Sequence, residues 1–243
     1  MAADPYVYPG TRVLRNTYGI RDAAELSRRE NDAVTVRLLQ LRLDPLAGNY
    51  DLEHLRAFHR HIFGDVYPWA GEIRTIAIAK TDLFALPQHI EPFLAGVLDK
   101  LSAEQYLRGL DRVHIVDRLT HYLAEINAAH PFREGNGRTQ RAFIGQLANQ
   151  AGYRIAWERG DATGNIDASV AAMRGDKRRC APCWASWWSL SPIRRADRPA
   201  LLSPSRPTWQ ARHHRRLRQA NEGQHGPARS CSANGPRSCR IPP

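Results

Sequence analysis

Twelve consecutive residues, 130–141, bring together most of the reactive side chains that stand out in this 243-residue sequence: "HPFREGNGRTQR". They combine a histidine, a carboxylate, two glycines around an asparagine, and two arginines three positions apart. Gly135, Asn136 and Gly137 come directly before a stretch with helical spacing. Their backbone N–H groups can therefore converge on one point together with the unpaired amides of a helix N-terminus. Such a turn is suited to binding an anion.

Arg138 and Arg141 fall in the first turn of that predicted helix. Two positive charges there oppose the helix dipole and each other, so they predict an anion that offsets them. Glu134, beside the turn, is an oxygen ligand suited to Mg²⁺, which takes one or two carboxylates and completes its shell with water and phosphate oxygens. Phosphate together with a metal indicates a nucleotide.

His130 ends the preceding helical stretch, four residues before the carboxylate. A neutral imidazole at this place could accept the proton of an attacking hydroxyl group. Pro131 and Phe132 are expected to fix the loop, with the phenyl ring anchored in the core. Taken singly, the histidine would more often be satisfied or exposed, the glutamate solvated, and Gly-Asn-Gly a plain turn. Taken together, these alternatives require several coincidences within twelve residues.

Five segments must position the loop, and all five have the apolar spacing of helices: residues 22–42, 51–63, 88–101, 112–129 and 138–151. Asp22 is a plausible N-cap, Asp51 opens the second helix, and Gly64 and Gly152 stand where helices should end. The apolar positions that define three of these helices are Leu26, Ala33, Val36 or another neighbour of Arg37, and Leu41; Val113, Val116, Leu119, Leu123 and Ile126; and Ala142, Phe143, Leu147 and Ala148.

The segment "EIRTIAIA" is rich in β-branched residues, and its Ile73, Ile76 and Ile78 are separated by polar or small residues. It predicts a short strand, the first arm of a β-hairpin whose turn lies near residues 80–82. Pro87 ends this extended region. The sequence therefore predicts a mostly helical domain with one hairpin, and it places residues 130–141 between the last two helices.

Charge is divided unevenly along the chain. The formal net charge is +11, but residues 174–243 hold 15 Lys+Arg against 3 Asp+Glu, and residues 1–173 hold 20 against 21. All four cysteines and four of the six tryptophans also lie in this C-terminal tail. The body is thus nearly neutral, with the composition of an ordinary globular protein and the length for one main domain.

The start of the chain, "MAADPYVYPG", lacks a basic stretch followed by an apolar run, so a secretory signal peptide is not expected. The sequence also lacks a run of eighteen apolar residues, which a membrane-spanning helix would need. A body without cysteine is compatible with a reducing compartment. These features predict a cytoplasmic location.

Residues 130–141 match in full the signature of the Fic family, His-x-Phe-x-Asp/Glu-Gly-Asn-Gly-Arg-x-x-Arg. The segments "YPGTRVLRNTYGI" and "VYPWAGEIRT", and the helix that leads into His130, also resemble the Fic domains of bacterial toxins and effectors. The resemblance covers roughly residues 6–176, which we take as a Fic domain spanning residues 1–176, followed by a tail, residues 177–243.

The resemblance implies an all-helical Fic fold with a β-hairpin flap, here about residues 73–86, that binds a target peptide by strand addition. It implies adenylylation, the transfer of AMP from ATP to a protein hydroxyl group with release of pyrophosphate. By position, it makes His130 the general base and Glu134 the Mg²⁺ ligand. Gly135, Asn136 and Gly137 would form an anion hole. Arg138 and Arg141 would bind the β- and γ-phosphates, and Phe132 would have a structural role.

Fic domains of this kind are commonly restrained by a helix carrying Ser/Thr-x-x-x-Glu-Gly/Asn, whose glutamate pairs with the second arginine of the signature, here Arg141. In this sequence every serine and threonine lacks a glutamate four positions later, and the nearest match, Ser27 with Glu30, is one residue short. The resemblance therefore implies a separate small antitoxin that carries the glutamate, because a charge-assisted contact of this kind is strong enough to act as a switch.

Similar bacterial toxins modify subunits of type II topoisomerases, which makes such a subunit the expected protein target. An exported effector acting on a host protein is the alternative. Two other functions stay open: a Fic protein that transfers a different phosphate-linked group, and a catalytically silent Fic binding module. The glutamate and both glycines favour AMP transfer.

The tail begins "KRRCAPCWASWWSLSPIRR". It could be a basic, tryptophan-rich arm for nucleic acid or membrane, a metal site at Cys180 and Cys183, or a disordered extension. We favour translation from a shifted reading frame, because moving back one base converts Cys-Trp to leucine, Trp-Ala to glycine and Trp-Trp to valine. The result is a leucine-patterned helix. On this hypothesis the tail has no selected function, and neither nucleic acid nor membrane is an expected partner.

Overall fold

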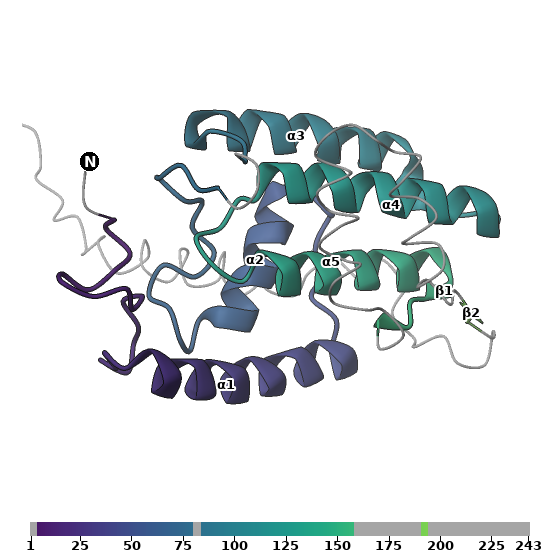
Figure 1. Ribbon diagram of the computed structural model, residues 1–243. Coiled ribbons are helices and arrows are strands. Elements are labelled where there is room, and N and C mark those ends of the chain that lie inside the picture. Colours follow the sequence, from purple (N-terminus) through teal and green to yellow (C-terminus); the bar gives the residue numbers. More distant parts are fainter. Residues whose placement is uncertain (1–3, 80–83, 158–190, 194–243) are drawn as a thin grey trace, which may run out of the picture. The chain divides into compact units, whose positions relative to one another are not determined.

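The computed structural model describes residues 4–79, 84–157 and 191–193, all within the unit Met1–Arg198 (Figure 1). The described residues are mostly helical, which confirms the predicted fold class. Their elements are α1 (Ala23–Leu43), α2 (Leu52–Phe63), α3 (Pro87–Ala103), the short 3₁₀ helix η1 (Gln105–Leu107), α4 (Arg112–Ala129), α5 (Asn136–Ala151), β1 (Tyr153–Arg154) and β2 (Ser191–Pro192).

The helix boundaries follow the capping residues of the sequence. Asp22 Oδ1 accepts a hydrogen bond from the backbone N–H of Glu25 at 2.7 Å, and Asp51 Oδ1 does the same for His54 at 2.8 Å. Gly152 ends α5 in the left-handed conformation, with φ +96°. The one notable shift is at the start of α5, which begins at Asn136 and not at residue 138. Asn136 and Gly137 are therefore part of the first helical turn.

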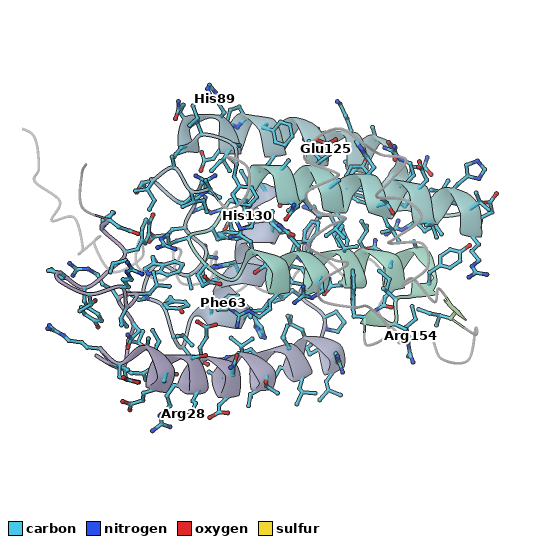
Figure 2. All side chains as sticks on the ribbon, in the orientation of Figure 1. Arg28, Phe63, His89, Glu125, His130 and Arg154 are labelled. Carbon is cyan, nitrogen blue, oxygen red and sulfur yellow. The ribbon has the colours of Figure 1, made fainter. Side chains whose placement is uncertain are left out.

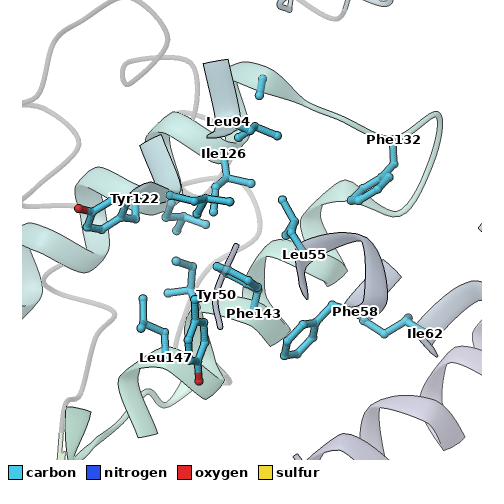
Figure 3. Close-up of a cluster of buried hydrophobic side chains, with 14 of the residues drawn as sticks. Tyr50, Leu55, Phe58, Ile62, Leu94, Tyr122, Ile126, Phe132, Phe143 and Leu147 are labelled. Atoms are coloured by element: carbon cyan, nitrogen blue, oxygen red, sulfur yellow. The ribbon is translucent and has the colours of Figure 1, made fainter. Parts of the chain in front are cut away.

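Helix α2 contacts α1, α3 and α5, while α4 packs between α3 and α5 (Figure 1). The core consequently draws side chains from every helix and from the loop between α4 and α5 (Figure 3). It includes Tyr50, Leu55, Phe58, Ile62, Leu94, Tyr122, Ile126, Phe132, Phe143 and Leu147. This packing brings the end of α4 and the start of α5 to the same end of the domain.

Two apolar positions predicted to face the core are exposed instead. Val36 is 55% exposed and Val113 is 76% exposed. Two residues along a helix rotate the side chain by about 200°, so Val34, which is buried, points away from Val36. The same rule makes Ile115, and not Val113, the first buried residue of α4. The helices were predicted correctly, but one position on each was assigned to the wrong face.

The predicted strand at residues 73–78 is not a regular strand. Its backbone groups bind other parts of the chain: the Arg74 N–H donates to Pro131 O at 2.9 Å, and the Thr75 N–H donates to the Tyr6 hydroxyl at 3.1 Å. The flap has a first side, residues 73–79, and a second side, residues 84–86. The Phe84 N–H donates to Ile78 O at 3.3 Å, and this hydrogen bond joins the two sides. The predicted turn near residues 80–82 lies outside the described residues.

The described part of the tail, residues 191–193, pairs with the chain that follows α5. Strand β2 is antiparallel to β1, with Tyr153 opposite Pro192 and Arg154 opposite Ser191. The Cys180–Cys183 pair and nearly all of the proposed shifted-frame segment lie outside the described residues. Among the described helices, none combines the length and apolar character needed to cross a membrane.

Candidate active site

His130 is the C-cap of α4 and adopts a left-handed backbone conformation, with φ 46° and ψ 61°. This conformation turns the chain out of the helix and directly into the loop, and a non-glycine residue adopts it only where the surroundings hold it. The His130 ring stacks on the Phe84 ring, with the ring centroids 3.8 Å apart and the planes at 14°. The predicted base thus lies against the second side of the flap, at the end of α4 (Figure 2).

The side chain of Asn136 closes the loop on itself. Its Oδ1 accepts a hydrogen bond from the Phe132 N–H at 2.9 Å, and its Nδ2 donates to Phe132 O at 2.7 Å. Asn136 is buried, and both ends of its amide are engaged in this bracing. Only its backbone N–H is left to take part in an anion site. The Asn136 side chain therefore stabilises the conformation of the loop and does not itself bind the anion.

His59, on α2, is a site residue that the sequence analysis missed. Its Nδ1 accepts from the Gly71 N–H at 2.8 Å and its Nε2 donates to Glu134 O at 3.0 Å, which fixes the Nε2–H tautomer. The ring stacks on Phe132 with centroids 3.9 Å apart. Burial lowers the pKa of His59 to about 4. This neutral imidazole ties the loop to the turn after α2.

Gly135 is required by both conformation and space. It has φ +79°, and a Cβ there would lie 2.3 Å from two carbon atoms of the Phe63 ring. Phe63 ends α2 (Figure 2), so the start of α5 sits directly against the end of α2. Because Gly135 carries no side chain, the start of α5 can pack directly against the Phe63 ring and the chain can adopt the positive φ that the turn requires.

Arg138 is surrounded by compensating groups. Its Nη2 lies 2.5 Å from Glu30 Oε1 and 3.5 Å from Glu134 Oε1, and its guanidinium stands over the Phe63 ring. Glu30, on α1, also accepts a hydrogen bond from the Tyr67 hydroxyl. Glu30 is the glutamate of the near match to the inhibitory pattern, yet it contacts the first arginine of the signature and not the second.

Arg141 has no carboxylate partner among the described residues. Burial lowers its pKa, and the neighbouring positive charge of Arg138 lowers it further. A desolvated guanidinium without a counter-charge is costly, and the Arg141 guanidinium reaches back to Gly137 in the first turn of α5. A negatively charged group bound here would therefore be stabilised by Arg141.

Glu134 fits the requirements of a Mg²⁺ site that is completed by phosphate. Its side chain is 45% exposed, and it stands next to the helix N-terminus where phosphates would bind. Its Oε1 accepts from the Gly135 N–H at 2.8 Å. The described residues contain no cluster of three or more metal-binding side chains. A single carboxylate suits Mg²⁺ held mainly by water and phosphate, and not a metal held by protein alone.

A family model described as "Fic/DOC family" matches residues 49–148. The matched region includes α2, the flap segment and α4, together with the loop and the start of α5 that carry the predicted site residues. "Probable protein adenylyltransferase Fic" of Escherichia coli (strain K12) is 39% identical over 156 residues, which cover 64% of this chain and 77% of that protein. The chain belongs to the Fic/DOC family. This confirms the family predicted from the twelve residues, and with it the prediction of an AMP-transferring enzyme.

Two further relatives extend the comparison. "Protein adenylyltransferase VbhT" of Bartonella schoenbuchensis is 42% identical over 174 residues, or 71% of this chain, but the match spans only 36% of VbhT. The crystal structure of BepC protein from Bartonella tribocorum, determined with bound AMPPNP, superposes with a TM-score of 0.70 at 26% identity. It covers 77% of this chain and 96% of that one. The fold is therefore shared with a protein whose crystal structure contains AMPPNP.

The structure brings the predicted site residues to one loop and one helix end. His130 stands at the end of α4, Glu134 in the loop, and Arg138 and Arg141 at the start of α5. It adds residues that the sequence analysis did not select. His59 had one available signal, since a histidine on the apolar face of a helix is expected to be buried and hydrogen-bonded.

Proposed function

We propose that this protein transfers AMP from ATP to the hydroxyl group of a serine, threonine or tyrosine in a target protein, with release of pyrophosphate. The observation that carries the proposal is Arg141, a largely desolvated cation with no carboxylate partner in the described part of the chain, next to the amides of a helix N-terminus. An anion with several negative charges relieves this arrangement, and a triphosphate has them. The names of the relatives supply the reaction type.

In the proposed reaction, His130 accepts the proton of the target hydroxyl as its oxygen bonds to the α-phosphorus of ATP. The bond from that phosphorus to the α,β-bridging oxygen breaks, and pyrophosphate leaves. The backbone amides of Gly135, Asn136 and Gly137 form the anion hole for the phosphates. Arg138 and Arg141 hold the β and γ groups. Glu134 would hold Mg²⁺, which supplies charge neutralisation for the triphosphate. Phosphoryl-type transfer depends mainly on such positioning and charge stabilisation.

The proposal includes regulation by a separate small antitoxin. A glutamate from that partner would pair with Arg141, which the described part of this chain leaves without a carboxylate. The pair would occupy the place of the γ-phosphate. Coexpression with the partner protein tests this, since changing its glutamate to glutamine should release AMP transfer. Equal activity with either residue would contradict the switch.

We propose a cytoplasmic bacterial protein as the target, with a type II topoisomerase subunit as the first to test. Residues 1–176 are proposed as the catalytic domain. The reading-frame hypothesis for residues 177–243 is tested by the gene sequence together with the intact mass of the expressed protein. A single uninterrupted frame that matches the mass would remove it.

The central experiment incubates the protein with ATP labelled in the adenine ring and with candidate targets, followed by mass spectrometry of modified peptides. We expect the mass increase of one AMP on a hydroxyl side chain. The variant His130→Ala should lower the transfer rate roughly 100- to 10,000-fold. It should leave ATP affinity nearly unchanged, because His130 is assigned to the proton and not to the phosphates. Loss of binding equal to the loss of transfer would contradict the base role. A mass increase on the target without the adenine label would indicate a different transferred group. Targets with neither the label nor a mass increase would indicate a silent module.

A further inference from the structure

Arg74 is the most deeply buried charged residue in the described part of the chain. It lies ten positions before Phe84, in the first side of the flap, and only 1% of its surface is exposed. Within the described residues it has no carboxylate partner, and every acceptor of its guanidinium is a backbone carbonyl. Burial lowers the pKa of Arg74, but a guanidinium keeps its charge in proteins. Burial of a cation without a counter-charge lowers the stability of the fold, so the groups that bind Arg74 indicate why it is there.

Two of its hydrogen bonds go to the end of α4. Arg74 Nε donates to His130 O at 2.8 Å, and Nη2 donates to Ala129 O at 3.2 Å. The last carbonyls of a helix have no partner within the helix, and this end of the helix dipole is negative. The guanidinium therefore both satisfies these carbonyls and offsets the dipole, directly at the backbone of the proposed base.

The other hydrogen bonds reach both sides of the flap. Nη1 donates to Ile76 O at 2.6 Å and Nη2 donates to Ala85 O at 2.5 Å. These two carbonyls lie on opposite sides of residues 80–83. The main chain adds a further link, since the Arg74 N–H donates to Pro131 O at 2.9 Å. One residue thus joins the first side of the flap, its second side and the active-site loop.

The second side of the flap is also in direct contact with His130. The Phe84 ring stacks on the His130 imidazole, and the Ala85 N–H donates to Ala128 O at 3.2 Å. The left-handed conformation of His130, φ 46°, persists only if neighbouring groups hold it. The hydrogen bonds of Arg74 act on this backbone from one side, and the stacked Phe84 ring acts on its side chain.

We propose that Arg74 is a positioning residue for AMP transfer. It fixes the position of the His130 imidazole relative to the two sides of the flap. This inference rests on the proposed function, in which His130 is the base and the flap holds the target peptide. Its consequence is that Arg74 controls proton acceptance at the bound hydroxyl group and has no part in binding ATP. A role in folding alone would instead change both in proportion to the amount of folded protein.

The test compares Arg74→Lys and Arg74→Met with a control, Arg118→Met. Arg118 is also partly buried, but it binds Glu104 and Tyr122, away from the loop. A lysine keeps the charge but cannot span all four carbonyls. We expect Arg74→Lys to lower the transfer rate about 10- to 100-fold, as for other lost positioning contacts, with ATP affinity within about twofold of the wild type. The control should transfer AMP at the wild-type rate.

A second readout does not depend on activity. In the full-length protein, ¹⁵N and ¹³C resonances of the His130 imidazole report its surroundings, and Arg74→Lys should shift both the resonances and their titration midpoint. Should Arg74→Met fail to fold, Arg74→Lys decides the matter. The inference is overturned by unchanged His130 resonances, by wild-type transfer in Arg74→Lys, or by losses of transfer and ATP affinity in equal proportion. A failure of the proposed function looks different: the wild type would transfer no AMP, while the shift of the His130 resonances in Arg74→Lys would remain.

Discussion

Residues 130–141, which form the loop after α4 and the start of α5, have two halves whose polar groups are bound in different ways. In residues 130–133, the polar groups are held by the protein itself: Arg74 donates to His130 O, Asn136 binds both backbone groups of Phe132, and Arg133 pairs with Asp4 at 2.9 Å. In residues 134–141, Glu134 is half exposed and Arg141 lacks a carboxylate partner within the described chain.

The difference suggests separate roles for the two halves, one in folding and one in binding a ligand. The first half stabilises a left-handed turn, so its hydrogen bonds are made within the fold. The second half keeps charge available for a ligand, which costs stability in the absence of that ligand. Changes to the contacts that hold the turn should therefore lower stability, whereas changes to the charged side chains of the second half should lower nucleotide affinity with little loss of stability. Four predictions test this contrast, from the largest expected effect to the smallest.

The largest effect is expected at Gly135, which lies in the second half but acts through its backbone conformation and its packing, and not through a charge. In Gly135→Ala, the new methyl group meets the Phe63 ring in a backbone conformation that alanine disfavours. Strain and crowding together should lower the free energy of unfolding by roughly 3 to 4 kcal/mol, measured by urea denaturation. Gly96→Ala is the control, because it lies within α3 and has open space around it. It should raise the same quantity by about 0.5 to 1 kcal/mol. Equal effects of the two changes would refute the argument from Gly135.

The next effect is a pH dependence of stability that comes from His59. Its pKa is about 4 in the folded protein and 6.5 without the fold, because burial disfavours the charged ring. The unfolded chain therefore takes up this proton first as the pH falls, so stability is complete above pH 6.5 and is lost between about pH 6.5 and 4, by up to about 3 kcal/mol. Burial lowers the pKa of His54 too, so it adds a loss of the same sign.

Urea denaturation at pH 7 and at pH 5 measures this loss in the wild type and in His59→Gln. The glutamine variant should be less stable at pH 7, since it loses the two hydrogen bonds to the loop and to Gly71, but its stability should change less between the two pH values. An identical pH dependence in both proteins would show that His59 is not the titrating group.

In the second half, Arg141→Met should separate affinity from stability. Loss of a charge-assisted phosphate contact should weaken ATP binding about 10- to 100-fold by calorimetry. The melting temperature without nucleotide should stay the same or rise, because the variant removes a desolvated charge next to Arg138. Arg154→Met, at an exposed position on β1, is the control and should alter neither. A fall in melting temperature with unchanged ATP affinity would show that Arg141 serves the stability of the fold and not the binding of ATP.

The smallest effect is expected from Glu30→Gln. Glu30 neutralises Arg138, the arginine that already has acidic partners, so its carboxylate competes with phosphate for the guanidinium. The Glu30 side chain is only 12% exposed. Removal of its charge should tighten ATP binding about threefold, while glutamine can still accept the hydrogen bond from the Tyr67 hydroxyl. Weaker binding would mean that Glu30 holds Arg138 in place for the phosphate and does not compete with it.

The helices and their ends follow from local rules that the sequence states directly. Asp22 and Asp51 cap their helices, Gly152 ends α5, and α4 occupies the predicted residues 112–129. The errors came from features that local rules do not fix. Val36 and Val113 were assigned to buried faces because apolar character alone does not tell which side of a helix meets a neighbour.

By itself, the sequence determined the reactive loop. Residues 130–141 identify the family, and they contain the proposed base, the proposed metal ligand and the arginines proposed to bind phosphate. All of these residues are close together in the sequence, at the end of α4 and the start of α5. Only the tertiary structure decided what holds them. Arg74, His59 and Glu30 are far from the loop in sequence, and no spacing rule links them to it. They reach it because α1, α2 and the flap fold against the ends of α4 and α5, where unpaired carbonyls and charges need partners.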